Sequence, residues 1–290
     1  MHFTGFGLPC QRVKRVWWPS TALDASMGRM PTDDSPMGVP NGLVSPSADG
    51  ADRPGVNDYD SFAEVYSAEN EINLHNAYYE RPATLALAGD VAGRRILDAG
   101  CGSGPLFAAL RDRGALVSGF DKSAGMLELA RRRLGDDADL RVADLDRPLP
   151  YPDGAFDDVI ASLVLHYFED WTAPLAELRR VLKPGGRLIA SVNHPIAGHP
   201  VVRPGVDYWA TYEWSEEITT ASGQSYVLAN WHRPLPAMIE AFTGAGFRIA
   251  AISEPRPAPD TPRELLPDFL QDKPPGAGFL CFIFFVLQAD

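Results

Sequence analysis

The sequence contains little cysteine, which limits the cross-links and metal sites that it can form. Its three cysteines, Cys10, Cys101 and Cys281, are odd in number and far apart. This argues against a disulfide framework and for a reducing compartment. No CxxC pair and no cysteine–histidine spacing typical of zinc sites occurs in the sequence. We therefore expect a cytoplasmic protein without a metal site.

No apolar run is long enough to cross a membrane as a helix. The longest, FLCFIFFVL at residues 279–287, has the length of a β-strand, whereas a spanning helix needs about 20 apolar residues. The N-terminal segment also lacks the apolar stretch of a signal peptide. We expect no membrane among the binding partners.

Concentrated positive charge is also missing. The formal net charge is −12, and basic residues gather only at 11–15 and 131–133. An acidic chain repels phosphate backbones unless it carries a concentrated basic patch. The charge therefore argues against DNA as a partner and favours a small molecule.

Residues 1–57 differ in composition from the rest of the chain. Most of this segment is dense in Pro, Gly, Ser and Asp, and such a composition buries too little apolar surface to stay folded. We interpret it as a disordered leader, with Met27, Met30 and Met37 as alternative starts. Residues 58–290 are predicted to form one folded domain.

Within that domain, short apolar runs alternate with segments of helical periodicity. Strands are predicted at residues 95–98, 116–121, 140–144, 156–162 and 186–193, with helices between them. Repeated β–α alternation with strands apolar on both faces predicts a doubly wound, Rossmann-like α/β sheet covered by helices. Residues 195–233 interrupt the alternation with two aromatic-rich extended runs, which predict an inserted β-hairpin acting as a lid.

The stretch ILDAGCGSGPLFAAL at residues 96–110 places a glycine-rich turn between a strand and a helix. A dinucleotide-binding turn would have glycine at the position of Pro105. Asp98, at the end of the strand, would also repel a pyrophosphate at close range. The turn therefore favours a ligand that carries positive charge on this side.

This stretch resembles the first motif of the class I S-adenosylmethionine-dependent methyltransferases. The resemblance implies that Asp98, Gly100, Gly102 and Gly104 surround the methionine part of that cofactor, with the acid on its ammonium side. It also implies a sheet of seven strands with an antiparallel last strand at residues 279–287. Upstream, Tyr66 would close over the cofactor and Arg81 would pair with its carboxylate.

Later strand ends continue the resemblance. Asp121 ends the second strand, where a carboxylate can accept both hydrogens of a ribose diol. The family pattern implies that the adenine and the remaining sheet edge are lined by Lys122, Met126, Asp144, Leu145 and Ser162.

The function predicted from this resemblance is methyl transfer from S-adenosylmethionine to a small molecule, at O or N rather than at a ring carbon. DNA amino-methylation is disfavoured because LHYF, not an Asn/Asp-Pro-Pro-aromatic motif, follows the fourth strand. Of four candidate general bases, His166, His194, His199 and His232, we favour His166 and His194, since they follow the fourth and fifth strands.

Two alternatives from other classes remain open at this point. One is a catalytically silent cofactor-binding sensor or partner subunit, and the other is a nicotinamide-dependent oxidoreductase. The sequence is compatible with a monomer or a homodimer.

Overall fold

The computed structural model describes residues 56–197, 205–220, 223–274 and 276–290. The predicted leader lies outside these ranges except for its last two residues, Val56 and Asn57. Val56 forms a parallel bridge with Val227. The Asn57 side chain donates to the carbonyl of Ala229 at 3.0 Å and accepts from its amide at 2.9 Å. Both residues are therefore attached to the folded domain.

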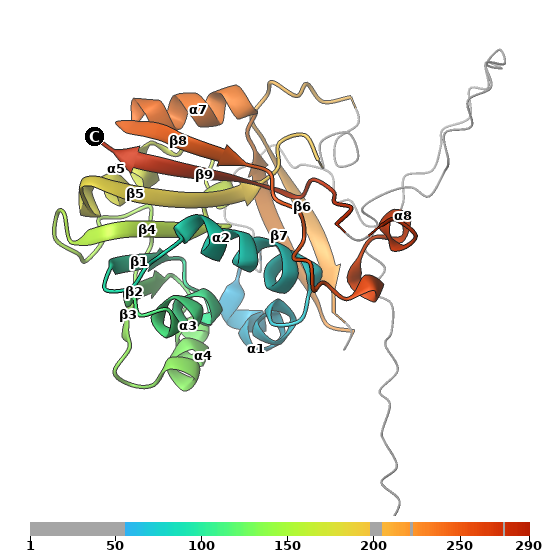
Figure 1. The fold of residues 1–290 in the computed structure, drawn as a ribbon, viewed down its shortest axis with the longest axis horizontal. Coiled ribbons are helices and arrows are strands. Elements are labelled where there is room, and N and C mark those ends of the chain that lie inside the picture. The colour runs from blue at the N-terminus through green and yellow to red at the C-terminus, as the bar shows by residue number, and fades with distance from the viewer. Residues whose placement is uncertain (1–55, 198–204, 221–222, 275) are drawn as a thin grey trace, which may run out of the picture.

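A seven-stranded mixed sheet forms the centre of the molecule (Figure 1). Its order is β3-β2-β1-β4-β5-β9-β8, and β9 runs antiparallel to both of its neighbours. The Rossmann-like fold and the antiparallel last strand expected from the sequence are thus confirmed. The strand bounds are β1 Arg95–Ala99, β2 Leu116–Asp121, β3 Asp139–Val142, β4 Phe156–Ser162, β5 Leu182–Asn193, β8 Phe247–Ser253 and β9 Phe282–Ala289.

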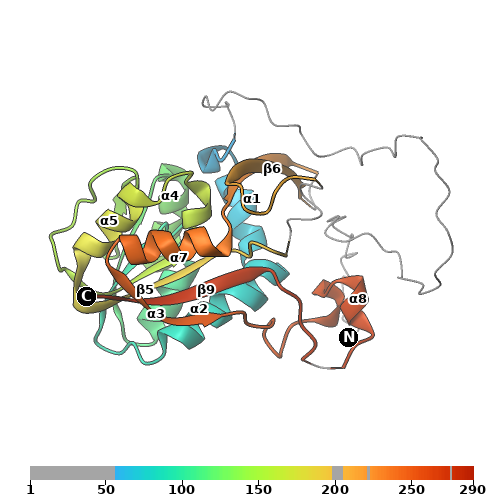
Figure 2. The same cartoon turned by 90° about the horizontal axis from the view of Figure 1, so that it is seen from above.

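Helices cover the sheet on both faces (Figure 2). On one face, α2 (Arg81–Ala88) and α3 (Pro105–Asp112) bury Leu85, Leu106 and Leu110 against β1, β4 and β5. On the other, α5 (Thr172–Val181) and α7 (Leu235–Gly244) bury apolar side chains such as Leu175 and Phe242. A fifth helix, α4 (Ala124–Leu134), packs beside α3. Burial on both faces explains why the central strands are apolar throughout.

In the Lys-Pro-Gly-Gly segment at residues 183–186, proline and the two glycines favour a turn between a helix and a strand. In the structure, α5 ends at Val181 and β5 begins directly at Leu182. Leu182 pairs with Phe156 and Arg187 pairs with Asp158, so the intervening residues bulge out of the strand. The segment is therefore a bulge within β5 and not a turn between the helix and the strand.

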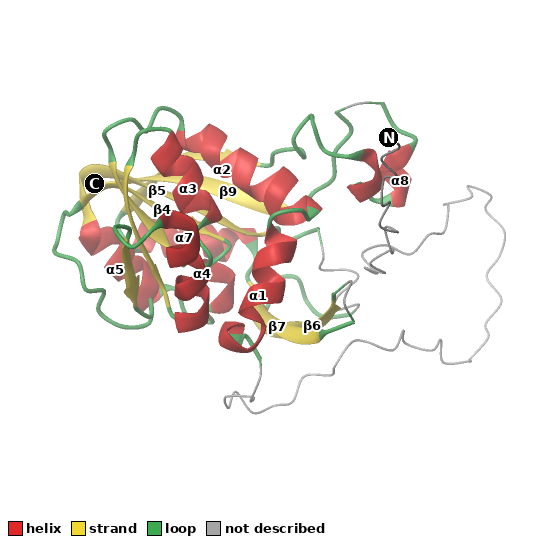
Figure 3. Ribbon diagram, turned by 90° about the horizontal axis from the view of Figure 1, so that it is seen from below, coloured by secondary structure: helices red, strands yellow, loops and turns green. Residues whose placement is uncertain are grey.

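A layer of helices and a β-hairpin, called the lid layer below, covers one end of the sheet (Figure 3). It consists of α1 (Tyr59–Asn70), the π-helix η1 (Asn76–Glu80), and the predicted hairpin, formed by β6 (Tyr212–Thr219) and β7 (Ser225–His232). The ring of Phe62 in α1 stacks on that of Tyr226 in β7, with centroids 4.3 Å apart. This contact joins the hairpin to α1.

Among the described residues, three short helices were not predicted. They are η2 (Leu165–Tyr167), after β4, and η3 (Arg263–Leu265) and α8 (Asp268–Gln271), in the proline-rich segment before β9. Each is held by few local hydrogen bonds, so periodicity gives no signal for it. No helix in the described ranges is long and apolar enough to cross a membrane.

Candidate functional site

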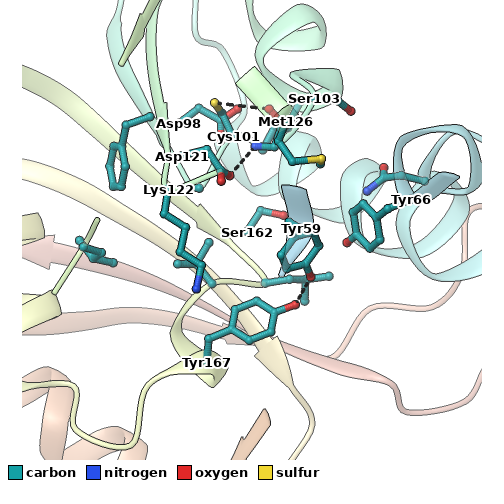
Figure 4. Close-up of a pocket in the computed structure, with 18 of the residues that line it drawn as sticks. Tyr59, Tyr66, Asp98, Cys101, Ser103, Asp121, Lys122, Met126, Ser162 and Tyr167 are labelled. Atoms are coloured by element: carbon teal, nitrogen blue, oxygen red, sulfur yellow. Dashed lines mark hydrogen bonds between the residues drawn. The ribbon is translucent and has the colours of Figure 1, made fainter. Parts of the chain in front are cut away.

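A cavity of about 240 Å³ opens where the carboxyl ends of β1, β2 and β4 meet the lid layer (Figure 4). Open α/β sheets bind their ligands at this edge. Eleven of the residues proposed from the sequence to bind a cofactor line it: Tyr66, Arg81, Asp98, Gly100, Gly102, Asp121, Lys122, Met126, Asp144, Leu145 and Ser162. The fold therefore brings together residues that are far apart in the sequence.

The glycine turn requires conformations that other residues adopt poorly. Gly102 has φ +54°, and a Cβ placed there would lie 3.2 Å from the Met126 methyl carbon. Its amide donates to Oδ2 of Asp121 at 2.9 Å, which ties the turn to the end of β2. Gly104 does not line the cavity. At φ +78°, its missing Cβ makes room for Leu134 of α4, at 2.9 Å, so packing explains this glycine.

Asp98 is a buried acid at the end of β1, with 1 % exposure. Its Oδ2 has no hydrogen-bond partner among the described residues. Burial raises the pKa of Asp98 to about 8, and the negative charges of Glu80 and Asp121 add to the shift. A carboxyl group in this state would gain from a positively charged ligand group.

Asp121, at the end of β2, is held in a fixed orientation. Its Oδ2 accepts from the Gly102 amide and its Oδ1 from the Ser123 amide, both at 2.9 Å. Burial raises the pKa of Asp121, and these two amides act against that shift. Each carboxylate oxygen keeps a second lone pair for a ligand hydroxyl.

Arg81, expected to pair with a carboxylate, already has protein partners. One terminal nitrogen donates to the backbone and side-chain oxygens of Asn70 at 2.8 and 2.9 Å. The other lies 3.5 Å from Glu71. A ligand carboxylate would therefore share Arg81 with Glu71 or displace it.

The two histidines favoured as general bases do not line this cavity in the described part of the chain. His166 is buried, and burial lowers its pKa to about 3, so it stays neutral and is a weak base. His194 Nε2 lies 2.9 Å from Glu254, and its Nδ1 accepts from the Ile196 amide at 3.2 Å. Their catalytic role stays a prediction that the geometry does not favour.

Among the cavity residues that the sequence did not identify as site residues, two tyrosines and one acid carry polar groups in notable positions. Tyr59 at the start of α1 and Tyr167 in η2 point toward one another, with their hydroxyl oxygens 2.5 Å apart (Figure 4). Glu80, buried with 4 % exposure, enters from the end of η1. An acid in a segment of helical periodicity is normally exposed, so the sequence gives no signal for Glu80.

The geometry fits S-adenosylmethionine. The unpartnered oxygen of Asp98 suits an ammonium group, and Asp121 suits a ribose diol. Absence of a Cβ at Gly102 allows a ligand to approach the backbone closely. A dinucleotide would place phosphate charge next to buried carboxylates, which is unfavourable.

Comparison with known proteins agrees with this geometry. A methyltransferase domain family model matches residues 97–190. A demethylmenaquinone methyltransferase from Clavibacter sepedonicus is 33% identical over 229 residues, which is 69% of this chain and 93% of the relative. A ubiquinone/menaquinone biosynthesis C-methyltransferase from Desulfotalea psychrophila is 34% identical over 165 residues, 55% of this chain and 66% of the relative.

Among solved structures, an S-adenosylmethionine-dependent methyltransferase from Mesorhizobium loti has a TM-score of 0.54 and 26% identity. The match covers 71% of this chain and 96% of that one. The chain belongs to the class I S-adenosylmethionine-dependent methyltransferases. It is a methyltransferase enzyme whose cofactor is S-adenosylmethionine.

Proposed function

We propose that this enzyme methylates a ring carbon of a small hydroxylated aromatic acceptor of the reduced-quinone class. The two relatives described above support this class, because one is a demethylmenaquinone methyltransferase and the other a quinone-biosynthesis C-methyltransferase. The sequence alone favoured an O or N acceptor. The proposal changes that preference and keeps the small-molecule acceptor.

The hydroxyl pair of Tyr59 and Tyr167 is the observation that carries the proposal. Both side chains line the cavity and are half-buried. The Tyr59 hydroxyl forms hydrogen bonds with the hydroxyls of Tyr167 and Tyr66. When Tyr59 donates to Tyr167, the Tyr167 hydroxyl keeps its own hydrogen for a ligand oxygen. Burial is the largest cause that raises the pKa of each tyrosine, so both stay neutral hydrogen-bond donors near pH 7.

A donor on the acceptor's oxygen favours reaction at carbon. An oxygen on an aromatic ring pushes electron density onto the neighbouring ring carbons. A hydrogen bond from Tyr167 would occupy a lone pair of that oxygen and make it a poorer nucleophile. The ring carbon would then take the methyl group as the C–S bond of the cofactor breaks, with S-adenosylhomocysteine as the leaving group. The ring C–H proton would pass to solvent, which restores aromaticity.

The cofactor supplies a methyl group that is already activated on a sulfonium, so the chain mainly has to bind and align. Asp98 would hold the amino group, Asp121 the ribose, and the backbone at Gly100 and Gly102 would lie along the ligand. Tyr66 and the Tyr59–Tyr167 pair would exclude water from the lid side of the cavity. Alignment of two reactants contributes up to about 7–11 kcal/mol in well-oriented systems.

Two acceptors that differ at one ring position test the proposal. The full chain is incubated anaerobically with S-adenosylmethionine carrying a CD₃ group and either a naphthoquinol with a free ring C–H or its analogue methylated at that carbon. We expect the label on the ring carbon of the first acceptor and none on the second. Label on oxygen, or equal labelling of both acceptors, would contradict C-methylation.

Variants connect this outcome to the tyrosine pair. Tyr167→Phe removes one hydroxyl and should lower the rate and increase the share of O-methyl product. Tyr78→Phe is the matched control, because Tyr78 lies outside the cavity wall. Identical product ratios in the two variants would show that the hydroxyl pair does not direct methylation to carbon.

A further inference from the structure

Two buried carboxylates face one cavity from different elements. Glu80 ends η1 and Asp98 lies in β1, and they are 4 % and 1 % exposed. Both line the cavity. They are close enough that the charge of Glu80 is the second cause, after burial, of the raised pKa of Asp98.

The protein satisfies these carboxylates only in part. Glu80 Oε1 accepts from the hydroxyls of Thr84 at 2.6 Å and Ser191 at 2.8 Å, which fix its orientation. Asp98 Oδ2 accepts nothing from the described residues. No ion pair within those residues includes either acid, and the neighbouring Arg81 turns toward Asn70 and Glu71.

A buried acid pair without a cation is expensive, and its natural partner is a positively charged ligand group. A metal ion is disfavoured, since no group of three or more His, Cys, Asp or Glu side chains in the described residues could hold one. An ammonium needs no third carboxylate. It has three N–H donors and can bond two carboxylates at once.

We propose that Glu80 binds the amino group of the cofactor together with Asp98, so that two carboxylates from different elements recognise the methionine end. This rests on S-adenosylmethionine occupying the cavity as described above. Glu80 ends η1 in the lid layer and Asp98 lies in β1 of the sheet. A ligand amino group bound by both would therefore add a connection between the lid layer and the sheet.

Calorimetric titration with three ligands separates this role from a structural one. S-adenosylhomocysteine carries the amino group, its deaminated analogue carries a hydroxyl in its place, and 5′-methylthioadenosine lacks the whole amino-acid part. In the unchanged protein we expect deamination to weaken binding by at least 30-fold. In Glu80→Gln, the factor by which deamination weakens binding should be at least tenfold smaller, because one partner of the amino group is gone.

Binding of 5′-methylthioadenosine reports whether the variants keep the folded cavity. It should stay within about twofold in Glu80→Gln. Glu80→Asp keeps the charge and should retain part of the preference for the amino group. Thr84→Val removes one of the two hydroxyls that orient Glu80 but keeps the charge, so it should reduce the preference for the amino group less than Glu80→Gln does.

Three outcomes would overturn the proposal. Deamination could weaken binding by the same factor in Glu80→Gln as in the unchanged protein, which would leave Asp98 as the sole partner of the amino group. Glu80→Gln could weaken all three ligands equally, which would make Glu80 a structural residue. Failure of the unchanged protein to bind any of the three ligands would contradict the cofactor assignment itself, and the proposal with it.

Discussion

The carboxylate of Asp60 in α1 caps the first turn of α4 from a different part of the chain. Its Oδ1 accepts from the Ser123 hydroxyl at 2.6 Å and from the Gly125 amide at 2.7 Å. These two bonds lower the pKa of Asp60. Asp60 does not line the cavity in the described structure, yet it holds the helix that carries Tyr59 and Tyr66 over it.

Asp60→Ala should therefore weaken cofactor binding without removing a ligand contact. Loss of a helix-capping side chain costs about 0.5–2 kcal/mol, and 1 kcal/mol corresponds to roughly fivefold in Kd. We expect the Kd of S-adenosylhomocysteine to rise by about that factor, measured by calorimetry. Glu64→Gln on the same helix is the control, because its pair with Arg132 is exposed on both sides and exposed pairs contribute little. Equal effects of the two variants would contradict the role of Asp60.

Gly102→Val should abolish cofactor binding. The backbone there has φ +54°, and the added side chain would enter the space between the turn and Met126. A β-branched residue in this conformation also costs about 1–3 kcal/mol. Gly185→Val separates the two effects, because Gly185 has φ +73° but nothing within 4 Å of its added Cβ. Gly185→Val should keep full binding, and undiminished binding by Gly102→Val would refute the placement of the turn.

Cofactor binding should release a proton from Asp98. With its pKa raised to about 8 by burial and by the charges of Glu80 and Asp121, Asp98 is mostly protonated in the empty cavity at pH 7. An ammonium beside it favours the ionised form. Affinity should consequently rise with pH between about 6 and 8, since fewer sites need to lose a proton.

Titrations at pH 7 in buffers of different ionisation enthalpy measure this release directly. We expect a proton release approaching one per bound cofactor, and a smaller value in Asp98→Asn. Without cofactor, the free energy of unfolding has the opposite pH dependence from the cofactor affinity. The protonated Asp98 contributes stability below its unfolded pKa of about 3.9, and this is lost as the pH rises toward 8. Binding without proton exchange would show that Asp98 is already ionised.

Variants of His166 and His194 test the general-base prediction. A general base contributes about 10²–10⁴-fold, so loss of the true base should lower turnover at saturating cofactor by at least 100-fold. Because neither imidazole lines the cavity in the described residues, we expect less than tenfold for His166→Ala and His194→Asn. A larger loss in either variant, with unchanged cofactor binding, would restore that histidine as the base.

The sheet and the glycine turn could be predicted because local sequence determines them. Strands apolar on both faces and an acid at the end of β1 and β2 leave a regular signal. The number of strands and the antiparallel last strand came from the family resemblance, whereas the order of the strands comes from the structure. The bulge at residues 183–186 was not predicted, because a turn and a bulge use the same proline and glycines.

The lid side of the cavity could not be predicted in the same way. The Tyr59–Tyr167 pair joins residues 108 positions apart, and no local pattern indicates that they meet. Glu80 belongs to a segment of helical periodicity in which an acid is normally exposed. Only the packing of η1 against β5, through Ser191, shows that it is buried.

Calorimetric titration of the full chain with S-adenosylmethionine and S-adenosylhomocysteine tests the central claim most directly. We predict micromolar binding of both, weakened about 10- to 100-fold in Asp121→Ala, since a hydrogen bond to a charged group contributes about 1.5–3 kcal/mol. The melting temperature of Asp121→Ala should be measured alongside, because its carboxylate also holds the Gly102 amide. Absence of binding by the unchanged protein, or equal affinity of a folded Asp121→Ala, would contradict the assignment of this cavity to the cofactor.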